Sequence, residues 1–164
     1  MKLLFIDDKH FENAYKDIAE QIKIHAKSLC DFKVLEYKDD KKLIEKFAPD
    51  LIFYLYSLKS DIHRQQVINL YKNKFRTATW LLEDKIIETT DVGYFYDFVF
   101  TTDLKNLEER RNKYRYTNIY FLSADEIYNR IKRIIFIYTY TNKDRRVIHK
   151  KELYGKDTYY DQTI

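Results

Sequence analysis

Glycine is almost missing from this chain of 164 residues, which contains only Gly93 and Gly155. Loops that bind nucleotide phosphates through backbone N–H groups depend on several closely spaced glycines, as in the P-loop and in the GxGxxG turn of dinucleotide-binding proteins. The chain can form neither pattern. The sequence therefore excludes a glycine-dependent cradle for a dinucleotide or a nucleoside triphosphate, and no bound cofactor is predicted.

Cysteine and long apolar runs are also scarce. Cys30 is the only cysteine, so the chain cannot form an internal disulfide, which is typical of a reducing compartment. No run approaches the roughly 18 apolar residues of a membrane span, and the opening run is followed by Asp7 and Asp8 where a signal peptide would continue. We expect a cytoplasmic protein with no membrane span.

The charges are unevenly distributed along the chain. The net charge is +4, and residues 131–164 hold eight lysines and arginines against four aspartates and glutamates, which leaves 22 of each sign in the first 130 residues. A protein that binds nucleic acid usually presents a basic face. Because the main body is neutral, nucleic acid is not an expected partner.

Short apolar runs alternate with helical patterns. Between Phe11 and Leu29 the apolar residues follow the 3.6-residue spacing of one helix face, and a short second helix must end before Pro49. The run LIFYL, residues 51–55, is typical of a central parallel strand buried on both faces. The alternation predicts an α/β protein, a Rossmann-like three-layer α/β/α fold with a mainly parallel sheet. Strands are predicted at residues 2–6, 32–35, 51–55, 78–82, 98–100 and 119–122.

The last part of the chain differs in pattern. We predict a helix from Ala124 to Ile131, a strand from Ile134 to Tyr138 and a basic helix that ends at Gly155. The sequence thus divides into a Rossmann-like N-terminal domain, residues 1–130, and a segment 131–164 that consists of a strand, a basic helix and a frayed C-terminus.

Polar residues follow the predicted strands at the points where the strands end. Glu83 and Asp84 follow the fourth strand, and Thr101, Thr102 and Asp103 follow the fifth. In open α/β sheets, ligands bind beyond the carboxyl ends of the strands. These five residues are therefore candidates for ligand binding. Further candidates follow the first and third strands: Asp7, Asp8, Ser57, His63 and Arg64.

Each acidic or aromatic candidate also has a structural interpretation. A carboxylate at such an edge can accept the proton of a sugar hydroxyl, so Glu83 or Asp84 can act as a general base; the alternative is a strand-end turn with two solvated carboxylates. Asp7 and Asp8 are candidates for ligand binding or for a helix-capping loop. Trp80 lies inside an apolar run, which favours a core position over a platform for stacking a sugar.

Basic side chains leave two interpretations open as well. His63 and Arg64 can bind phosphate or occupy an exposed helical turn. Arg145 and Arg146 belong to a basic cluster at helical spacing, which can contact a nucleotide diphosphate or an acidic partner, or form a solvated helix face. No histidine has the spacing of a zinc ligand, so no metal site is predicted.

The opening LLFIDD and the later PDLIFYL resemble the first and third strands of response-regulator receivers. That family phosphorylates an aspartate at the end of the third strand. Aligned on the sequence from Pro49 to Leu51, this position is Leu55, and the later lysine of the family has no match. Acyl-phosphate chemistry needs a carboxylate nucleophile. A degenerate receiver-like regulatory domain is retained as an alternative only.

A second resemblance covers most of the chain through five motifs in order: KLLFID, FAPDLIFYLYS, TATWLLED, YFYDFVFTTD and TNIYFLSADE. The series resembles the N-terminal domain of the glycosyltransferases related to the spore maturation protein CgeB. In that family a strand holding a tryptophan ends in an acidic pair, and an aromatic-Asp-aromatic-valine strand with threonines follows. The order and spacing of the motifs together carry the resemblance.

This resemblance implies a GT-B enzyme, in which two Rossmann-like domains flank a cleft. It makes Glu83 and Asp84 catalytic candidates on the acceptor side, with a nucleotide sugar as co-substrate. RIIFIYTYTNKDRRVIHKKELYG resembles the opening of the second domain, with Tyr138 where the family has glycine. Because the second domain supplies most of the nucleotide-sugar site, we expect a chain that is inactive alone or that needs a second domain or a homo-oligomer. The alternative is a non-catalytic protein-interaction module.

Overall fold

The computed structural model describes residues 1–7, 13–36, 42–56, 68, 71–82, 96–112, 118–123 and 126–144. Its strands are β1 (Lys2–Ile6), β2 (Asp31–Leu35), β3 (Leu51–Tyr56), β4 (Arg76–Leu81), β5 (Phe98–Thr101) and β6 (Ile119–Phe121). Its helices are α1 (Asn13–Leu29), α2 (Lys42–Phe47), α5 (Leu104–Asn112) and α6 (Ile127–Asp144). Six of the seven predicted strands are confirmed to within two residues at either end.

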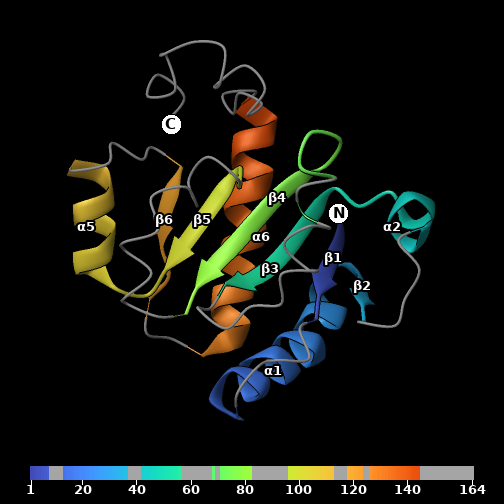
Figure 1. Cartoon of the computed structure of the whole chain (residues 1–164), viewed down its shortest axis with the longest axis horizontal. Coiled ribbons are helices and arrows are strands. Elements are labelled where there is room, and N and C mark those ends of the chain that lie inside the picture. Colours follow the sequence, from blue (N-terminus) through green and yellow to red (C-terminus); the bar gives the residue numbers. More distant parts are fainter. Residues whose placement is uncertain are drawn as a thin grey trace.

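The strands form a single parallel sheet in the order β2-β1-β3-β4-β5-β6 (Figure 1). After β1 the chain moves outward to β2, and from β3 onward it moves in the opposite direction. The sheet therefore has a topological switch point between β1 and β3, as in the flavodoxin-type order 2-1-3-4-5, to which β6 adds one strand. The predicted Rossmann-like α/β fold is confirmed.

Helices cover both faces of the sheet, so the molecule has three layers. On one face Phe5 and Phe53, with ring centroids 5.9 Å apart, belong to a buried cluster that includes Ile22 of α1 and Ile134 of α6. On the other face, the buried side chains of the strands pack with α2 and α5. That second cluster contains Leu4, Ile6, Ile52 and Tyr54 of the sheet, Ile44 and Phe47 of α2, and Leu107 of α5.

The end of α2 follows from the proline that comes next. Ala48 has a φ of 50°, and its N–H donates to the carbonyl of Ile44 over 2.9 Å, which closes the helix in the left-handed region. Pro49 disfavours a helical conformation for Ala48, so the helix cannot continue. Asp50 then accepts a hydrogen bond from the N–H of Lys2 at 2.7 Å, which aligns the start of β3 with the start of β1.

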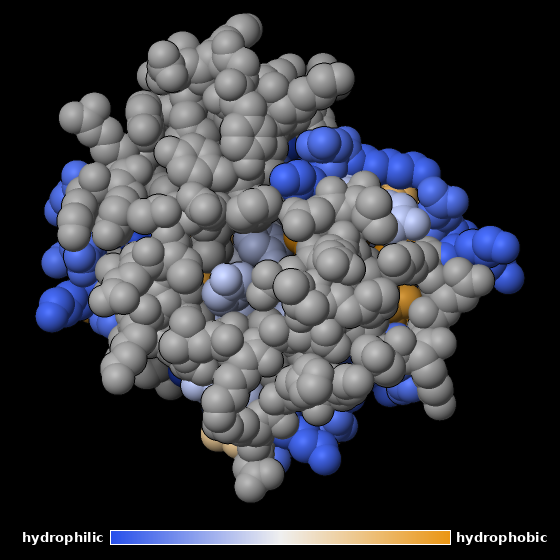
Figure 2. Space-filling model, in the orientation of Figure 1, coloured by the Kyte–Doolittle hydropathy of each residue, from blue (hydrophilic) through white to orange (hydrophobic). Residues whose placement is uncertain are grey.

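Figure 2 shows one face of the molecule. Hydrophilic residues of the described surface lie at the two sides of this view, around α2 and α5, and also at its lower rim. In the ranges that the structure describes, no helix has the length and apolar character needed to cross a membrane.

The strand that we predicted from Ile134 to Tyr138 is wrong, because these residues lie within the 18-residue helix α6. Ile131, Ile134 and Ile137 are buried at helical spacing, whereas Phe136 is 58% exposed. The run IIFIY is short, apolar and β-branched, and such runs do not distinguish a strand from a buried helix segment by periodicity. Packing against α1 decides the outcome in favour of the helix.

Helix α6 also continues without a break through residue 130, where we divided the chain. Its buried isoleucines belong to the same cluster as the side chains of the sheet and of α1. Residues 131–144 therefore complete the α/β/α layers and do not form the opening strand of a second domain. The predicted basic helix and C-terminus, from residue 145 onward, lie outside the described residues.

Candidate functional site

The carboxyl ends of the six strands meet along one side of the sheet, here called the carboxyl edge. Leu81 of β4 pairs with Thr101 of β5, so these two strands end at the same level. Asp7 is the first residue after β1, beside the switch point, and Thr102 is the first residue after β5. A ligand of a sheet with this topology binds at the carboxyl edge.

Four of the predicted site residues can be placed: Asp7, Thr101, Thr102 and Asp103. The other predicted site residues lie outside the described part of the chain. These are Asp8, Ser57, His63, Arg64, Glu83, Asp84, Arg145 and Arg146.

Asp7 forms an ion pair with Lys23, a residue that was not predicted from the sequence. The ammonium of Lys23 on α1 lies 2.6 Å from the Asp7 carboxylate and 2.7 Å from Glu20. Burial alone would lower the pKa of Lys23, but its hydrogen bonds to the two carboxylates outweigh burial and raise it. A ligand of the Asp7 carboxylate must therefore compete with Lys23. The ion pair also links the end of β1 to α1.

The residues after β5 form the start of α5. The hydroxyl of Thr101 accepts a hydrogen bond from the N–H of Asp103 at 3.1 Å, and the Asp103 carboxylate accepts one from the N–H of Lys105 at 2.9 Å. Asp103 therefore occupies the N-cap of α5, where a carboxylate satisfies a free backbone N–H and interacts favourably with the helix dipole. Thr101 is buried, and Thr102 is exposed at the carboxyl edge.

Replacing Asp103 by alanine should destabilise the protein by about 1 kcal/mol, the usual effect of losing an N-cap side chain. Urea unfolding would measure this change. Thr102→Ala, at the exposed neighbouring position, is the control and should change the unfolding free energy by less than about 0.5 kcal/mol. Equal effects of the two substitutions would contradict the capping role.

Trp80 is a core residue, as predicted, and is only 3% exposed. It lies between Leu55 of β3 and Phe100 of β5, and the guanidinium carbon of Arg130 is 5.1 Å from the centre of its ring. Arg130 also donates from Nε to the carbonyl of Ser123 at 3.0 Å. A sugar cannot stack on a ring that is covered in this way.

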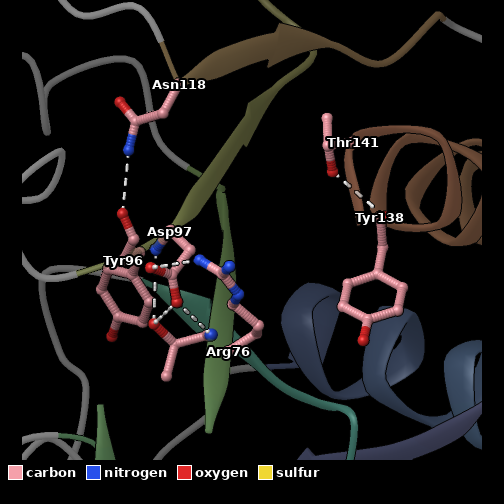
Figure 3. Close-up of polar contacts among 7 residues, drawn as sticks. Arg76, Tyr96, Asp97, Asn118, Tyr138 and Thr141 are labelled. Carbon is pink, nitrogen blue, oxygen red and sulfur yellow. Dashed lines mark hydrogen bonds and ion pairs between the residues drawn. The ribbon is translucent and has the colours of Figure 1, made fainter. Parts of the chain in front are cut away.

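A polar cluster that sequence analysis missed lies at the opposite edge of the sheet, where the strands begin (Figure 3). The buried carboxylate of Asp97 accepts a hydrogen bond from the N–H of Thr77 at 2.7 Å and lies 3.8 Å from the guanidinium of Arg76. The amide of Asn118 donates to the carbonyl of Tyr96 at 2.8 Å. The cluster joins the starts of β4, β5 and β6, so its place indicates a structural role. The sequence pattern that could have indicated this cluster is the aspartate inside the aromatic run YFYDFVF.

Tyr96, Tyr120 and Cys30 do not supply acid–base groups near neutral pH, because the pKa of each is raised. Burial raises the pKa of Tyr96 well above its usual value, against the opposing effect of a hydrogen bond with Thr79. Burial also raises the pKa of Tyr120 to about 12. The pKa of Cys30 is raised by burial too, so this half-buried thiol is not activated as a nucleophile.

No group of side chains suited to a metal ion occurs in the described residues. His25 contacts the side chains of Gln21 and Tyr128. Its Nε2 lies 3.2 Å from Gln21, and its ring packs edge-on against Tyr128.

No protein family, curated protein or solved structure was found to match the chain. The likeness to the CgeB-related glycosyltransferases therefore depends on the sequence motifs alone.

Proposed function

We propose that this chain is the Rossmann-like, acceptor-side domain of a GT-B glycosyltransferase system related to CgeB, with its ligand bound at the carboxyl edge. The observation that carries the proposal is the parallel pairing of β4 and β5, with Leu81 opposite Thr101. These strands hold the two most characteristic motifs, TATWLLED and YFYDFVFTTD. Their pairing supports a common ligand edge, because the chain leaves β4 just before Glu83 and leaves β5 at Thr102.

The proposed roles follow from the chemistry of these side chains. Glu83 or Asp84 accepts the proton of the acceptor hydroxyl as general base, and the exposed Thr102 offers a hydroxyl for hydrogen bonding to the sugar. In this proposal the carboxyl edge supplies one wall of a cleft. Glycosyl transfer from a nucleotide sugar then requires a second wall, from a second domain or from a partner chain. Arg145 and Arg146 are proposed to contact phosphate or that partner through charge-assisted hydrogen bonds.

Calorimetric titration with UDP-glucose and GDP-mannose, and with oligosaccharide acceptors, tests this proposal. We expect weak binding that Glu83→Gln or Asp84→Asn reduces about tenfold, which corresponds to about 1.4 kcal/mol. The matched control is Asp50→Asn, because Asp50 lies at the opposite edge, where its carboxylate accepts the N–H of Lys2. Absence of binding to all of these compounds, by the chain alone and with a second-domain partner, would remove the proposal.

A second candidate function is a non-catalytic interaction module, and one surface favours it. Phe136 and Tyr140 are exposed on α6, with their rings stacked at 6.1 Å, and Arg133 lies 5.9 Å from the Phe136 ring. Exposed aromatic and arginine side chains are typical of binding surfaces. Binding of a protein partner that Phe136→Ala abolishes and that Glu83→Gln leaves unchanged would favour this function.

The strand order 2-1-3-4-5 is shared with receivers, yet phosphoryl acceptance is not proposed. Leu55, at the position that aligns with the phosphorylated aspartate, is fully buried in β3. It offers neither a carboxylate nor access to a phosphoryl donor.

A further inference from the structure

The outer side of β2 is the feature from which we draw this inference. β2 is the end strand of the sheet and pairs with β1 alone among the described strands. The N–H of Asp31 donates to the carbonyl of Met1 at 3.1 Å, and the N–H of Asp7 donates to the carbonyl of Leu35 at 3.0 Å. Backbone groups alternate in direction along a strand. The N–H and C=O groups of Phe32 and Val34 therefore point away from the sheet.

The side chains of β2 divide into two sets. Asp31 and Lys33 are exposed on the face that α2 covers, where the ammonium of Lys33 lies 5.0 Å from the centre of the Phe47 ring. Phe32 and Val34 are half-buried on the face that α1 covers. The edge thus presents backbone hydrogen-bonding groups, two opposite charges and two partly exposed apolar side chains.

We propose that β2 pairs antiparallel with β2 of a second copy of this chain, about a two-fold axis at Phe32. The pairing joins two six-stranded sheets into one continuous sheet. The two copies of Phe32 exchange both of their outward N–H···O=C hydrogen bonds. Asp31 of each copy then lies opposite Lys33 of the other, at positions without backbone hydrogen bonds, where opposing Cα atoms are only about 4.5 Å apart.

Charge selects this register over its neighbours. An axis at Lys33 would set the two copies of Lys33 opposite each other, and an axis at Asp31 would do the same for the two aspartates. An axis at Val34 would set Lys33 opposite Leu35. Opposite charges across two strands are favourable and like charges are unfavourable, so the axis at Phe32 alone forms two attractive pairs.

Charged residues on an edge strand commonly prevent such pairing, lysine above all. Here Asp31 and Lys33 have opposite signs and lie two residues apart on one face, so reversing the strand brings each charge to its complement. A contact of this kind is closed, because the same patch is used on both copies. It forms a dimer without extending into a fibre, and it leaves the carboxyl edge of each copy uncovered.

Sedimentation equilibrium of the full chain over a range of concentrations tests the dimer through charge reversal. Asp31→Lys and Lys33→Asp each convert both attractive pairs into repulsive pairs, and each should weaken the dimer by about tenfold or more. The double variant Asp31→Lys/Lys33→Asp restores opposite charges and should regain the affinity of the unaltered chain. An equimolar mixture of the two single variants should form a heterodimer, since every pair across that interface has opposite signs.

Two further variants keep the test decisive. Lys16→Asp makes the same change in net charge as Lys33→Asp, at an exposed position of α1, and should not alter association. Phe32→Pro removes the outward N–H of each copy, which the contact uses and β1 does not, and should abolish the dimer while the bonds between β1 and β2 remain. A chain that stays monomeric at every soluble concentration would overturn the proposal. So would a dimer that resists both single reversals, or one that the double variant and the mixture fail to restore.

Discussion

A chain that ends at Arg130 is expected to lose cooperative folding. The deletion removes Ile131, Ile134 and Ile137, which are buried against the sheet and α1. Burying one such side chain contributes roughly 1.5–3 kcal/mol. The combined loss is comparable with the roughly 5–15 kcal/mol by which a whole domain is stable. Urea unfolding followed by the fluorescence of Trp80, the one tryptophan in the sequence, would show a gradual change in place of a sharp transition.

Single alanine substitutions in α6 distinguish the helix from the strand that was predicted from the sequence for residues 134–138. Ile134→Ala should cost roughly 2–4 kcal/mol, because it leaves a cavity in the core. Phe136→Ala should change stability by less than about 0.5 kcal/mol, because Phe136 is exposed. In a strand the two side chains would share one face and respond alike. Two results would contradict the packing of α6 as a helix in the core. One is a cooperative transition in the chain that ends at Arg130, and the other is a similar loss of unfolding free energy in both alanine variants.

Asp97→Ala is expected to destabilise the protein by about 3 kcal/mol, in the range for breaking a buried charged hydrogen-bonding group. The substitution takes away the carboxylate that accepts the N–H of Thr77 at 2.7 Å and its hydroxyl at 3.3 Å. It also removes the negative charge 3.8 Å from Arg76, whose side chain is only 15% exposed. The unfolding free energy from urea titration measures the loss.

Two companion variants show which property of Asp97 matters. Asp97→Asn keeps an acceptor oxygen and removes the charge, so about half of the loss should remain. Asp50→Ala removes another carboxylate from the start of a strand, one that accepts the N–H of Lys2 on the exposed surface. The loss for Asp50→Ala should be below about 1 kcal/mol. If Asp97→Ala cost no more than Asp50→Ala, the cluster would not hold the starts of β4 and β5 together.

Burial explains why the strands could be predicted. Parallel strands covered on both faces must be apolar throughout, so runs such as residues 51–55 and 98–100 identified β3 and β5. The apolar character of residues 134–138 led to the wrong prediction of a strand, because a run of apolar β-branched residues fits a buried helix face equally well. Neither the alternation nor the composition of IIFIY separates these outcomes. The packing of α6 against α1, far away in the sequence, separates them.

The candidate site was predictable only in outline. The ends of β1 and β5 were predicted from the sequence, and the fold places Asp7 and Thr102 at the carboxyl edge of the sheet; ligand binding there stays a prediction. The pairing of Asp7 with Lys23 joins two elements and has no local pattern. The capping role of Asp103 could have been predicted, since an aspartate directly before a helix is a common N-cap. Asp97 could have been identified as a residue that needs partners, because a carboxylate in an apolar run is otherwise costly to bury.

The strand order has a consequence for folding during synthesis. Among the described strands, β1, β2 and β3 are made before the others and already form adjacent pairs, and β4, β5 and β6 each add to the outer side in the order in which they are made. The helix that shields part of the sheet beside α1 is α6, which follows all six of the described strands. Until α6 emerges, side chains such as Phe98 and Phe100 face water on a nearly complete sheet. Stalled nascent chains of this protein are therefore expected to be chaperone clients, since such exposed apolar surface promotes aggregation.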